Sequence, residues 1–182
     1  MKLYTLRHGQ TKMNKRDLIV GRTDDELTQE GMKQAECIAE KIALFSEKCI
    51  PNIIIASPLQ RAKKTAEIVA KKLALEVMYD DRLIEQDYGS FEATSRLSEA
   101  FLNSKKQFVK RLPEGGESMF DLVGRVYPFL NEIHQKYADK NVLLVTHGGI
   151  LRIIRTYFLS MENEEFSSYR ALNCQLDEYE WL

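Results

Sequence analysis

Two stretches of the chain are apolar almost without interruption and have the length of a β-strand. Residues 52–57 read NIIIAS, and residues 141–147 read NVLLVTH. Such runs, without polar alternation, are typical of strands that are buried on both faces of a sheet. Shorter strand patterns lie at residues 2–8, 75–79 and 171–182. We therefore expect a sheet with two buried central strands, and we place the last segment at an edge.

Helical patterns separate these strands. Apolar residues recur with a helical period in residues 27–48, where Thr28 is the expected N-cap, and in residues 59–74. Further helices are expected at residues 95–111, 118–137 and 148–161. Because strands and helices alternate, the sequence predicts an α/β fold of three layers, with a mostly parallel central sheet and helices on both faces.

The helix expected at residues 118–137 has two marked features. Ser118 is a favourable N-cap, and Pro128 should kink the helix or break it locally, because proline lacks a backbone donor. His134 lies on a polar stretch of this helix, so we expect it at the surface. The apolar face is expected to comprise Phe120, Val123, Tyr127 and Leu130.

The region between the second and third long helices has a weak pattern. Periodicity is lost at residues 80–92, which predicts a loop, and residues 112–118 (LPEGGES) form a turn-rich break. The basic run at residues 104–111 is expected to be a solvated face, although it could also meet a charge on a substrate. We find no linker, so we expect one domain over residues 1–182, with a variable lid or specificity region at about residues 80–112.

Composition narrows the class of protein. The 182 residues include 26 Lys and Arg and 27 Asp and Glu, which gives a formal net charge of -1. This balance gives no bulk attraction to nucleic acid or to an anionic membrane, and no segment has the length of an apolar membrane span. The chain begins with a strand pattern rather than a signal peptide, and Cys37, Cys49 and Cys174 are spaced as reduced thiols. We therefore expect a cytoplasmic protein without a nucleic-acid or membrane partner.

Basic and imidazole side chains follow three of the expected strands. The first strand ends in Arg7 and His8, the second runs into SPLQRA with Arg61 in a helical first turn, and the third ends at His147, followed by Gly148. Ligands of open α/β sheets bind at the carboxyl ends of the strands, where helix N-termini also point their N–H groups. The sequence therefore predicts one cationic pocket in a neutral protein, suited to a phosphoryl dianion held by arginine forks.

Two histidines in such a pocket indicate chemistry as well as binding. Neighbouring arginines favour the neutral form of His8, and a neutral imidazole nitrogen is a competent nucleophile towards phosphorus. His147 and the arginines would spread the charge that builds on the transferring group.

A departing alkoxide also needs a proton donor. The segment DRLIEQDYGSFE offers Glu85, with Asp87 and Glu92 as further candidates, and Asp24 and Asp25 lie near the first strand. Sequence position alone does not choose among these acids.

These residues resemble a known family. LRHGQT is similar to the RHGxT/S signature of the histidine phosphatase superfamily, which includes the cofactor-dependent phosphoglycerate mutases. The stretches VGRTDDELTQEGMKQA, IIASPLQRAKKTAEIV, RLIEQDYGSFE, PEGGES and VLLVTHGGILR resemble further motifs of the family in the family's order. The resemblance covers nearly the whole chain, and it implies a phosphoglycerate mutase-like fold.

The resemblance also implies roles at the matching positions. His8 would become a phosphohistidine, and Glu85 would be the proton donor and then the base for water. The phosphoryl group would be bound by Arg7, Arg61 and His147, with assistance from Asn14 and the backbone N–H of Gly148. The family needs no metal, and we expect no cofactor.

Departures from the family favour a phosphatase over a mutase. Arg22 stands where mutases often carry tryptophan, and Gln86 and Asp87 replace their basic pair, although Tyr88 is retained. The chain also lacks a clear counterpart of the long mutase insertion with its paired arginines. A more open site lets water reach the intermediate. We expect Arg22, Tyr88, Phe91 and Lys105 to influence which substrate is accepted.

The sequence thus predicts a metal-independent phosphatase that hydrolyses small phosphorylated metabolites through a phosphohistidine on His8 and releases inorganic phosphate. A cofactor-dependent phosphoglycerate mutase is the first alternative, and a non-catalytic phosphate-binding module is the second. The sequence indicates neither the physiological substrate nor the oligomeric state.

Overall fold

The computed structural model describes residues 1–181. Its sheet has five strands in the order β3-β2-β4-β1-β5. Neighbours among the first four strands are parallel, and β5 pairs antiparallel with β1. The bounds are β1 Lys2–Arg7, β2 Ile53–Ala56, β3 Val77–Tyr79, β4 Val142–Thr146 and β5 Leu176–Glu180. The expected mostly parallel sheet is confirmed, and so is the place of the last strand at an edge.

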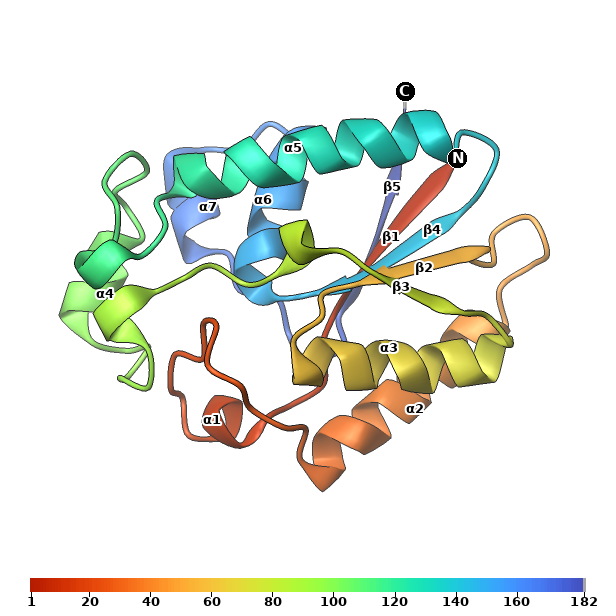
Figure 1. Ribbon diagram of the computed structural model, residues 1–182, viewed down its shortest axis with the longest axis horizontal. Coiled ribbons are helices and arrows are strands. Elements are labelled where there is room, and N and C mark those ends of the chain that lie inside the picture. The colour runs from red at the N-terminus through yellow and green to blue at the C-terminus, as the bar shows by residue number, and fades with distance from the viewer. Residues whose placement is uncertain (182) are drawn as a thin grey trace.

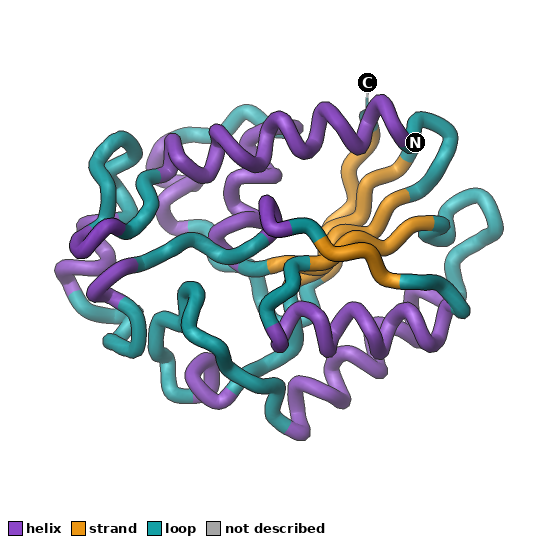
Figure 2. Tube along the Cα trace, in the orientation of Figure 1, coloured by secondary structure: helices purple, strands orange, loops and turns teal. Residues whose placement is uncertain are grey.

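Helices cover both faces of this sheet, as Figures 1 and 2 show. One face carries α2 (Gln29–Ala43) and α3 (Gln60–Leu73), and the other carries α5 (Met119–Lys136) and α6 (Gly148–Phe158). The expected three-layer α/β fold is therefore confirmed. Three short helices complete the fold: α1 Lys12–Lys15, α4 Glu99–Ser104 and α7 Asn163–Ser168. Single 3₁₀ turns lie at Asp81–Leu83, Gly89–Phe91 and Pro113–Gly115.

Alternate residues of the strands supply the two cores. In β1, Leu3 packs with α5 and α6, whereas Tyr4 and Leu6 pack with α2 and α3. In β4, Leu144 packs on the side of α5 and α6, and Leu143 packs on the side of α2 and α3. Because successive strand side chains point to opposite faces, an uninterrupted apolar run is what a sheet covered on both faces requires.

A glycine pair explains how the loop after β1 packs against α2. Thr28 caps α2 by accepting from the backbone N–H of Gly31 at 3.0 Å, as expected. A β-carbon on Gly31 would lie 2.1 Å from the carbonyl oxygen of Gln10, and one on Gly9 would lie 2.4 Å from the carbonyl oxygen of Gly31. The two backbones therefore touch, and this contact fixes the chain directly after His8 against a helix.

Helix α5 differs from the expectation at two points. Of the kink or local break expected at Pro128, the break is wrong, because α5 runs through this residue. Both Pro128 and Gly124 are exposed, so water can bond to the carbonyl that proline leaves free. Phe120 was also assigned wrongly to the apolar face, since it is 63% exposed. The buried residues of α5 are Met119, Leu122, Val126, Phe129, Leu130 and Ile133.

The helix expected at residues 95–111 is mostly irregular. Only α4 is helical there, and Phe101 is its single buried residue, which gives a longer helix little to pack against. The helix expected at residues 148–161 ends at Phe158, and α7, which follows it, was not predicted. Six residues are too few to leave a clear helical period.

His134 is less exposed than expected. Its ring is stacked on that of Trp181, with ring centroids 4.3 Å apart. The pair lies at the end of α5 and packs beside the last strand. Within the described part of the chain, no helix has both the length and the apolarity to cross a membrane.

Candidate active site

The carboxyl ends of the three central strands lie level with one another. Arg7 is paired in register with Thr146, and the backbone N–H of His8 donates to the carbonyl of Thr146 at 3.0 Å. The N–H of Ser57 donates to the carbonyl of Val145 at 3.0 Å. The expected convergence of these segments is therefore present in the fold.

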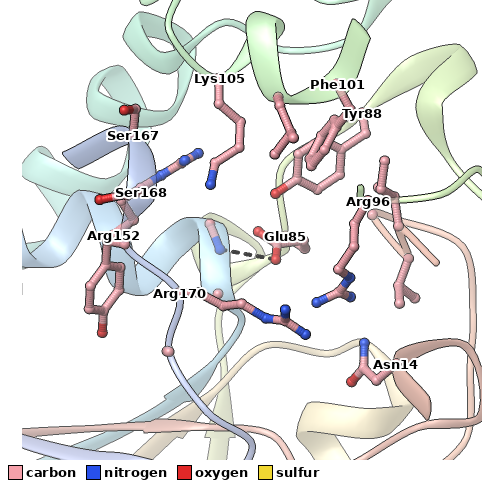
Figure 3. Close-up of a pocket in the computed structure, with 18 of the residues that line it drawn as sticks. Asn14, Glu85, Tyr88, Arg96, Phe101, Lys105, Arg152, Ser167, Ser168 and Arg170 are labelled. Atoms are coloured by element: carbon pink, nitrogen blue, oxygen red, sulfur yellow. Dashed lines mark hydrogen bonds between the residues drawn. The ribbon is translucent and has the colours of Figure 1, made fainter. Parts of the chain in front are cut away.

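A cavity of about 520 Å³ opens at these strand ends. Most of the predicted site residues line it: Arg7, His8, Asn14, Arg61, Glu85, Tyr88 and Gly148. Figure 3 shows this cavity with Glu85 near the middle of the view and Asn14 below it. His147 lies directly behind the lining, with its ring centroid 5.2 Å from that of His8. Arg22 does not line the cavity and instead pairs with Glu117 at 3.1 Å.

The environment of His8 fixes which ring nitrogen carries the proton. Its Nδ1 lies 2.7 Å from the carbonyl oxygen of Gly9, which can only accept, so Nδ1–H is the donor. The lone pair is then on Nε2. Burial lowers the pKa of His8 well below its usual value, and the charges of Arg61 and Arg7 lower it further. His8 is therefore a neutral imidazole whose Nε2 can act as an acceptor.

His147 is completely buried and is held by a serine. Its Nε2 lies 2.7 Å from Oγ of Ser57, at the end of β2. Burial lowers the pKa of His147 well below the usual value, and electrostatic repulsion from Arg61 and then from His8 lowers it further. Its Nδ1 has no hydrogen-bond partner within residues 1–181. Sequence reasoning did not assign Ser57 a place in the site, although it is the first residue of the SPLQRA stretch that carries Arg61.

Arg7 and Arg61 are both buried at the strand ends. Arg7 donates through Nη1 to the carbonyl of Ala171 at 2.8 Å. Burial lowers the pKa of Arg7 to about 10, with Arg96 as the next cause, so Arg7 remains charged at neutral pH. Arg61 is 1% exposed and donates to the carbonyl oxygens of Gly21 at 2.6 Å and Thr23 at 3.0 Å.

The loop that holds Arg61 is itself held by a carboxylate. Glu92 accepts from the backbone N–H groups of Arg22 at 2.8 Å and Thr23 at 2.9 Å. Gly21 in this loop has a φ of +58°, and a β-carbon there would lie 2.0 Å from the Glu92 carboxylate. Glu92 therefore shapes the loop around Arg61 and does not face the cavity.

Glu85 is the acid that the fold delivers to the cavity. It is 7% exposed, its Oε1 accepts from the backbone N–H of Gln86 at 2.8 Å, and its Oε2 accepts from that of Gly149 at 3.1 Å. Asp87 instead accepts from the N–H of Gly89, and Asp25 from that of Met13. Of the five acids that the sequence left open, Glu85 alone lines the cavity, and the other four are Asp24, Asp25, Asp87 and Glu92.

The remaining predicted residues lie around the rim and base. Asn14 accepts through Oδ1 from the side-chain amide of Asn173 at 3.2 Å. Gly148 is the first residue of α6, where its backbone N–H has no helical carbonyl to bond to and can bind an anion, whereas the next N–H, of Gly149, is taken by Glu85. Tyr88 packs edge-on against Phe101, and burial raises the pKa of Tyr88.

Sequence reasoning missed a second group of basic residues in the cavity. Arg96, Arg152 and Arg170 line it together with Lys105, which sequence reasoning had named for specificity and as part of the basic run at residues 104–111. The basic run at residues 104–111 is therefore not wholly a solvated face. Arg152 left a signal, because it interrupts the apolar pattern of GGILRII on a helix whose neighbouring residues are buried. Within residues 1–181, no three His, Cys, Asp or Glu side chains are grouped as metal ligands would be.

Comparison with known proteins supplies a family. The profile described as "Histidine phosphatase superfamily (branch 1)" matches residues 3–182. A Bacillus subtilis (strain 168) protein named "Uncharacterized phosphatase PhoE" is 33% identical over 176 residues, which cover 97% of this chain and 86% of that protein. A Salmonella choleraesuis (strain SC-B67) protein named "Probable phosphoglycerate mutase GpmB" is 32% identical over 194 residues, covering 100% of this chain and 88% of that protein.

Solved structures show the same fold. Mycobacterial glucosyl-3-phosphoglycerate phosphatase in complex with VO3 has a TM-score of 0.85 and 28% identity, covering 97% of this chain and 90% of that one. The same phosphatase with inorganic phosphate has a TM-score of 0.80 and 26% identity, covering 97% and 88%. These neighbours confirm the phosphoglycerate mutase-like α/β fold that the sequence predicts.

Proposed function

The chain belongs to the histidine phosphatase superfamily as an enzyme of the phosphoric monoester hydrolase type, and we propose that it hydrolyses small phosphorylated metabolites through a phosphohistidine on His8. One observation carries this proposal. The Nε2 lone pair of His8 lies in the same cavity as two buried guanidinium groups, Arg7 and Arg61, and one carboxylate, Glu85. This set contains a nucleophile, a cradle for a dianion and a proton carrier.

In the first half-reaction, Nε2 of His8 attacks phosphorus in line, so that an N–P bond forms while the P–O bond to the alcohol breaks. Arg7 and Arg61 stabilise the charge on the transferring oxygens, with His147 and the backbone N–H of Gly148. The protonated carboxyl of Glu85 donates its proton to the departing alkoxide oxygen. The positive charge on the imidazole is shared with the Gly9 carbonyl through Nδ1–H.

In the second half-reaction, the Glu85 carboxylate takes a proton from water, and the resulting hydroxide attacks phosphorus. The P–N bond breaks, its electron pair returns to Nε2, and inorganic phosphate leaves. Glu85 is protonated again, so the cycle closes without a further reactant. Phosphate should inhibit by occupying the same pocket, and vanadate, which resembles the trigonal-bipyramidal transition state, should inhibit more strongly.

The test is phosphate release from a panel of phosphomonoesters by the wild type and by His8→Asn. We expect His8→Asn to lower kcat/KM at least roughly a thousandfold, because the nucleophile is lost. Acid-quenched wild type should carry phosphate on His8 by mass spectrometry. Unchanged turnover in the variant would refute the nucleophile, and a wild type that binds phosphate without turnover would favour a non-catalytic binding module.

A phosphoglycerate mutase is the second candidate, supported by the name of the Salmonella relative. The wild type should be given 3-phosphoglycerate and 2,3-bisphosphoglycerate. Release of inorganic phosphate supports a phosphatase. Rapid formation of 2-phosphoglycerate without phosphate release would support the mutase instead.

A further inference from the structure

The cavity carries more positive charge than one phosphoryl group can neutralise. Arg7 and Arg61 lie at the strand ends beside His8, and they suffice to hold a phosphoryl dianion. The rest of the lining adds five basic residues, against two carboxylates in total, those of Glu85 and Glu164. The five are Arg96, Lys105, Lys106, Arg152 and Arg170. A protein with a formal net charge of -1 has therefore gathered a surplus of cations in one place.

Arg152 is the least expected of these residues. It is 3% exposed, its guanidinium packs over the ring of Phe166 at 4.9 Å, and its closest polar contact is the sulfur of Met119 at 3.5 Å. It forms no ion pair within residues 1–181, and its Nε has no hydrogen-bond partner there. The Glu85 carboxylate acts on Arg152 only from a distance, without an ion pair. A buried charge that no ion pair compensates is costly, so a guanidinium in this position indicates an anion supplied from outside.

Lys105 faces the same space from the end of α4. Burial lowers the pKa of Lys105 to about 8, and the charges of Arg152, Arg170 and Arg96 contribute. No carboxylate of residues 1–181 forms an ion pair with its Nζ. The cations therefore repel one another across the cavity, and a bound anion would relieve this repulsion.

The other two arginines share one weak counter-ion. Arg170 lies 3.1 Å from Asp17, and Nε of Arg96 lies 3.9 Å from the same carboxylate oxygen. Asp17 is half exposed, so solvent screens both interactions. Figure 3 shows Arg96, Lys105, Arg152 and Arg170 extending into the cavity from different segments, with Glu85 between them and Tyr88 beside them.

From this arrangement we infer that the alcohol half of the substrate carries a second anionic group, a carboxylate or a second phosphate, which binds between Arg152 and Lys105. The inference rests on the proposed phosphatase function and narrows its substrate class. The phosphoryl group lies at the strand ends, Glu85 faces the scissile oxygen, and the second anion lies on the far wall towards α4 and α7. Ser167 and Ser168 line this wall as well and can add hydroxyl donors.

Two pairs of substrates test the inference. Glycerol 3-phosphate carries a hydroxymethyl group at the position where 3-phosphoglycerate carries a carboxylate. Fructose 6-phosphate and fructose 1,6-bisphosphate differ in the second phosphate. We expect the wild type to prefer the more anionic member of at least one pair by about tenfold or more in kcat/KM. The pair that shows the preference identifies the kind of anion.

Variants connect the preference to the two residues. Lys105→Met should reduce the preference by about tenfold, whereas Lys110→Met, which removes an exposed lysine of the same segment outside the cavity, should leave it unchanged. Arg152→Met should reduce it as well, with thermal unfolding used to establish that the variant is folded. Equal kcat/KM values within both substrate pairs would overturn the inference. So would a preference that survives in Lys105→Met and in folded Arg152→Met. In either case, continued release of phosphate would leave the proposed function intact. Release of phosphate from no member of the wider phosphomonoester panel would instead refute the proposed function, and the inference with it.

Discussion

The backbone N–H of Gly149 donates to Oε2 of Glu85 at 3.1 Å, and a β-carbon on Gly149 would lie 2.4 Å from the other carboxylate oxygen of Glu85. The first turn of α6 thus positions the acid that faces the cavity, and it can do so only because residue 149 lacks a side chain.

Gly149→Ala is therefore expected to displace the Glu85 carboxylate. We predict a loss of roughly a hundredfold in kcat, because a misplaced proton donor sacrifices much of the benefit of general acid catalysis. Gly124→Ala in α5 is the matched control, since a β-carbon there meets nothing within 4 Å. The control should keep its activity and gain up to about 1 kcal/mol in the free energy of unfolding. Equal activities of the two variants would contradict the prediction.

Glu85→Gln tests the proton transfer directly. An alkyl phosphate releases a strongly basic alkoxide, so we predict a loss of roughly 10² to 10⁴ in kcat with such a substrate. An aryl phosphate with a nitrophenol leaving group needs little protonation, and its first half-reaction should be much less affected. Rapid-quench measurement of the phosphoenzyme separates this step from hydrolysis. A loss of the same size with both leaving groups would argue against Glu85 as the donor.

The two buried histidines predict how stability depends on pH. The pKa of His8 and that of His147 lie below the unfolded value of about 6.5, so the unfolded chain binds more protons than the folded chain below that pH. Each histidine should therefore lower the free energy of unfolding by about 1.4 kcal/mol per pH unit as the pH falls from about 6.5 towards its folded pKa. Above about pH 6.5 this contribution does not change. Urea titrations at several pH values should show a shallower decline for His8→Asn than for the wild type, and parallel curves would exclude the effect.

Glu92 holds the loop whose carbonyls accept hydrogen bonds from Arg61. Neutralising Glu92 should therefore loosen this loop and disturb the orientation of the Arg61 guanidinium. In Glu92→Gln, one of the two oxygens that accept from Arg22 and Thr23 is replaced by a donor. We predict phosphate inhibition weakened several-fold and a raised KM, with kcat less affected. Glu36→Gln, at an exposed position on α2, should match the wild type. Unchanged phosphate inhibition in Glu92→Gln would show that the loop does not orient Arg61.

The central sheet and the residues at its strand ends could be predicted from the sequence because their signals are local. Uninterrupted apolar runs identified β2 and β4, and the parallel arrangement then required His8, Arg61 and His147 to lie at one edge. Glu85 came from an irregular segment and could be separated from Asp87 and Glu92 only by its contacts in the fold. Those contacts, with Gln86 and Gly149, join residues that no periodic pattern relates.

The residues that line the far wall were largely beyond sequence reasoning. Arg96 and Arg170 occupy irregular segments that are distant along the chain, and α7 is too short to be recognised by its period. Arg152 interrupts the apolar pattern of α6, but this signal gives no indication of the direction in which its side chain points. Only the packing of α6 against α5 and α7 places its guanidinium in the cavity.

The short helix α4 and the irregular chain around it contribute no strand to the sheet and little to either core, yet they form the wall that the leaving alcohol would meet. An exchange of residues 96–111 for a segment of different composition would leave the strand ends intact. Such chimaeras offer a route to enzymes of altered selectivity, in which the side chains at the strand ends are unchanged and only the preference for the alcohol half of the substrate differs.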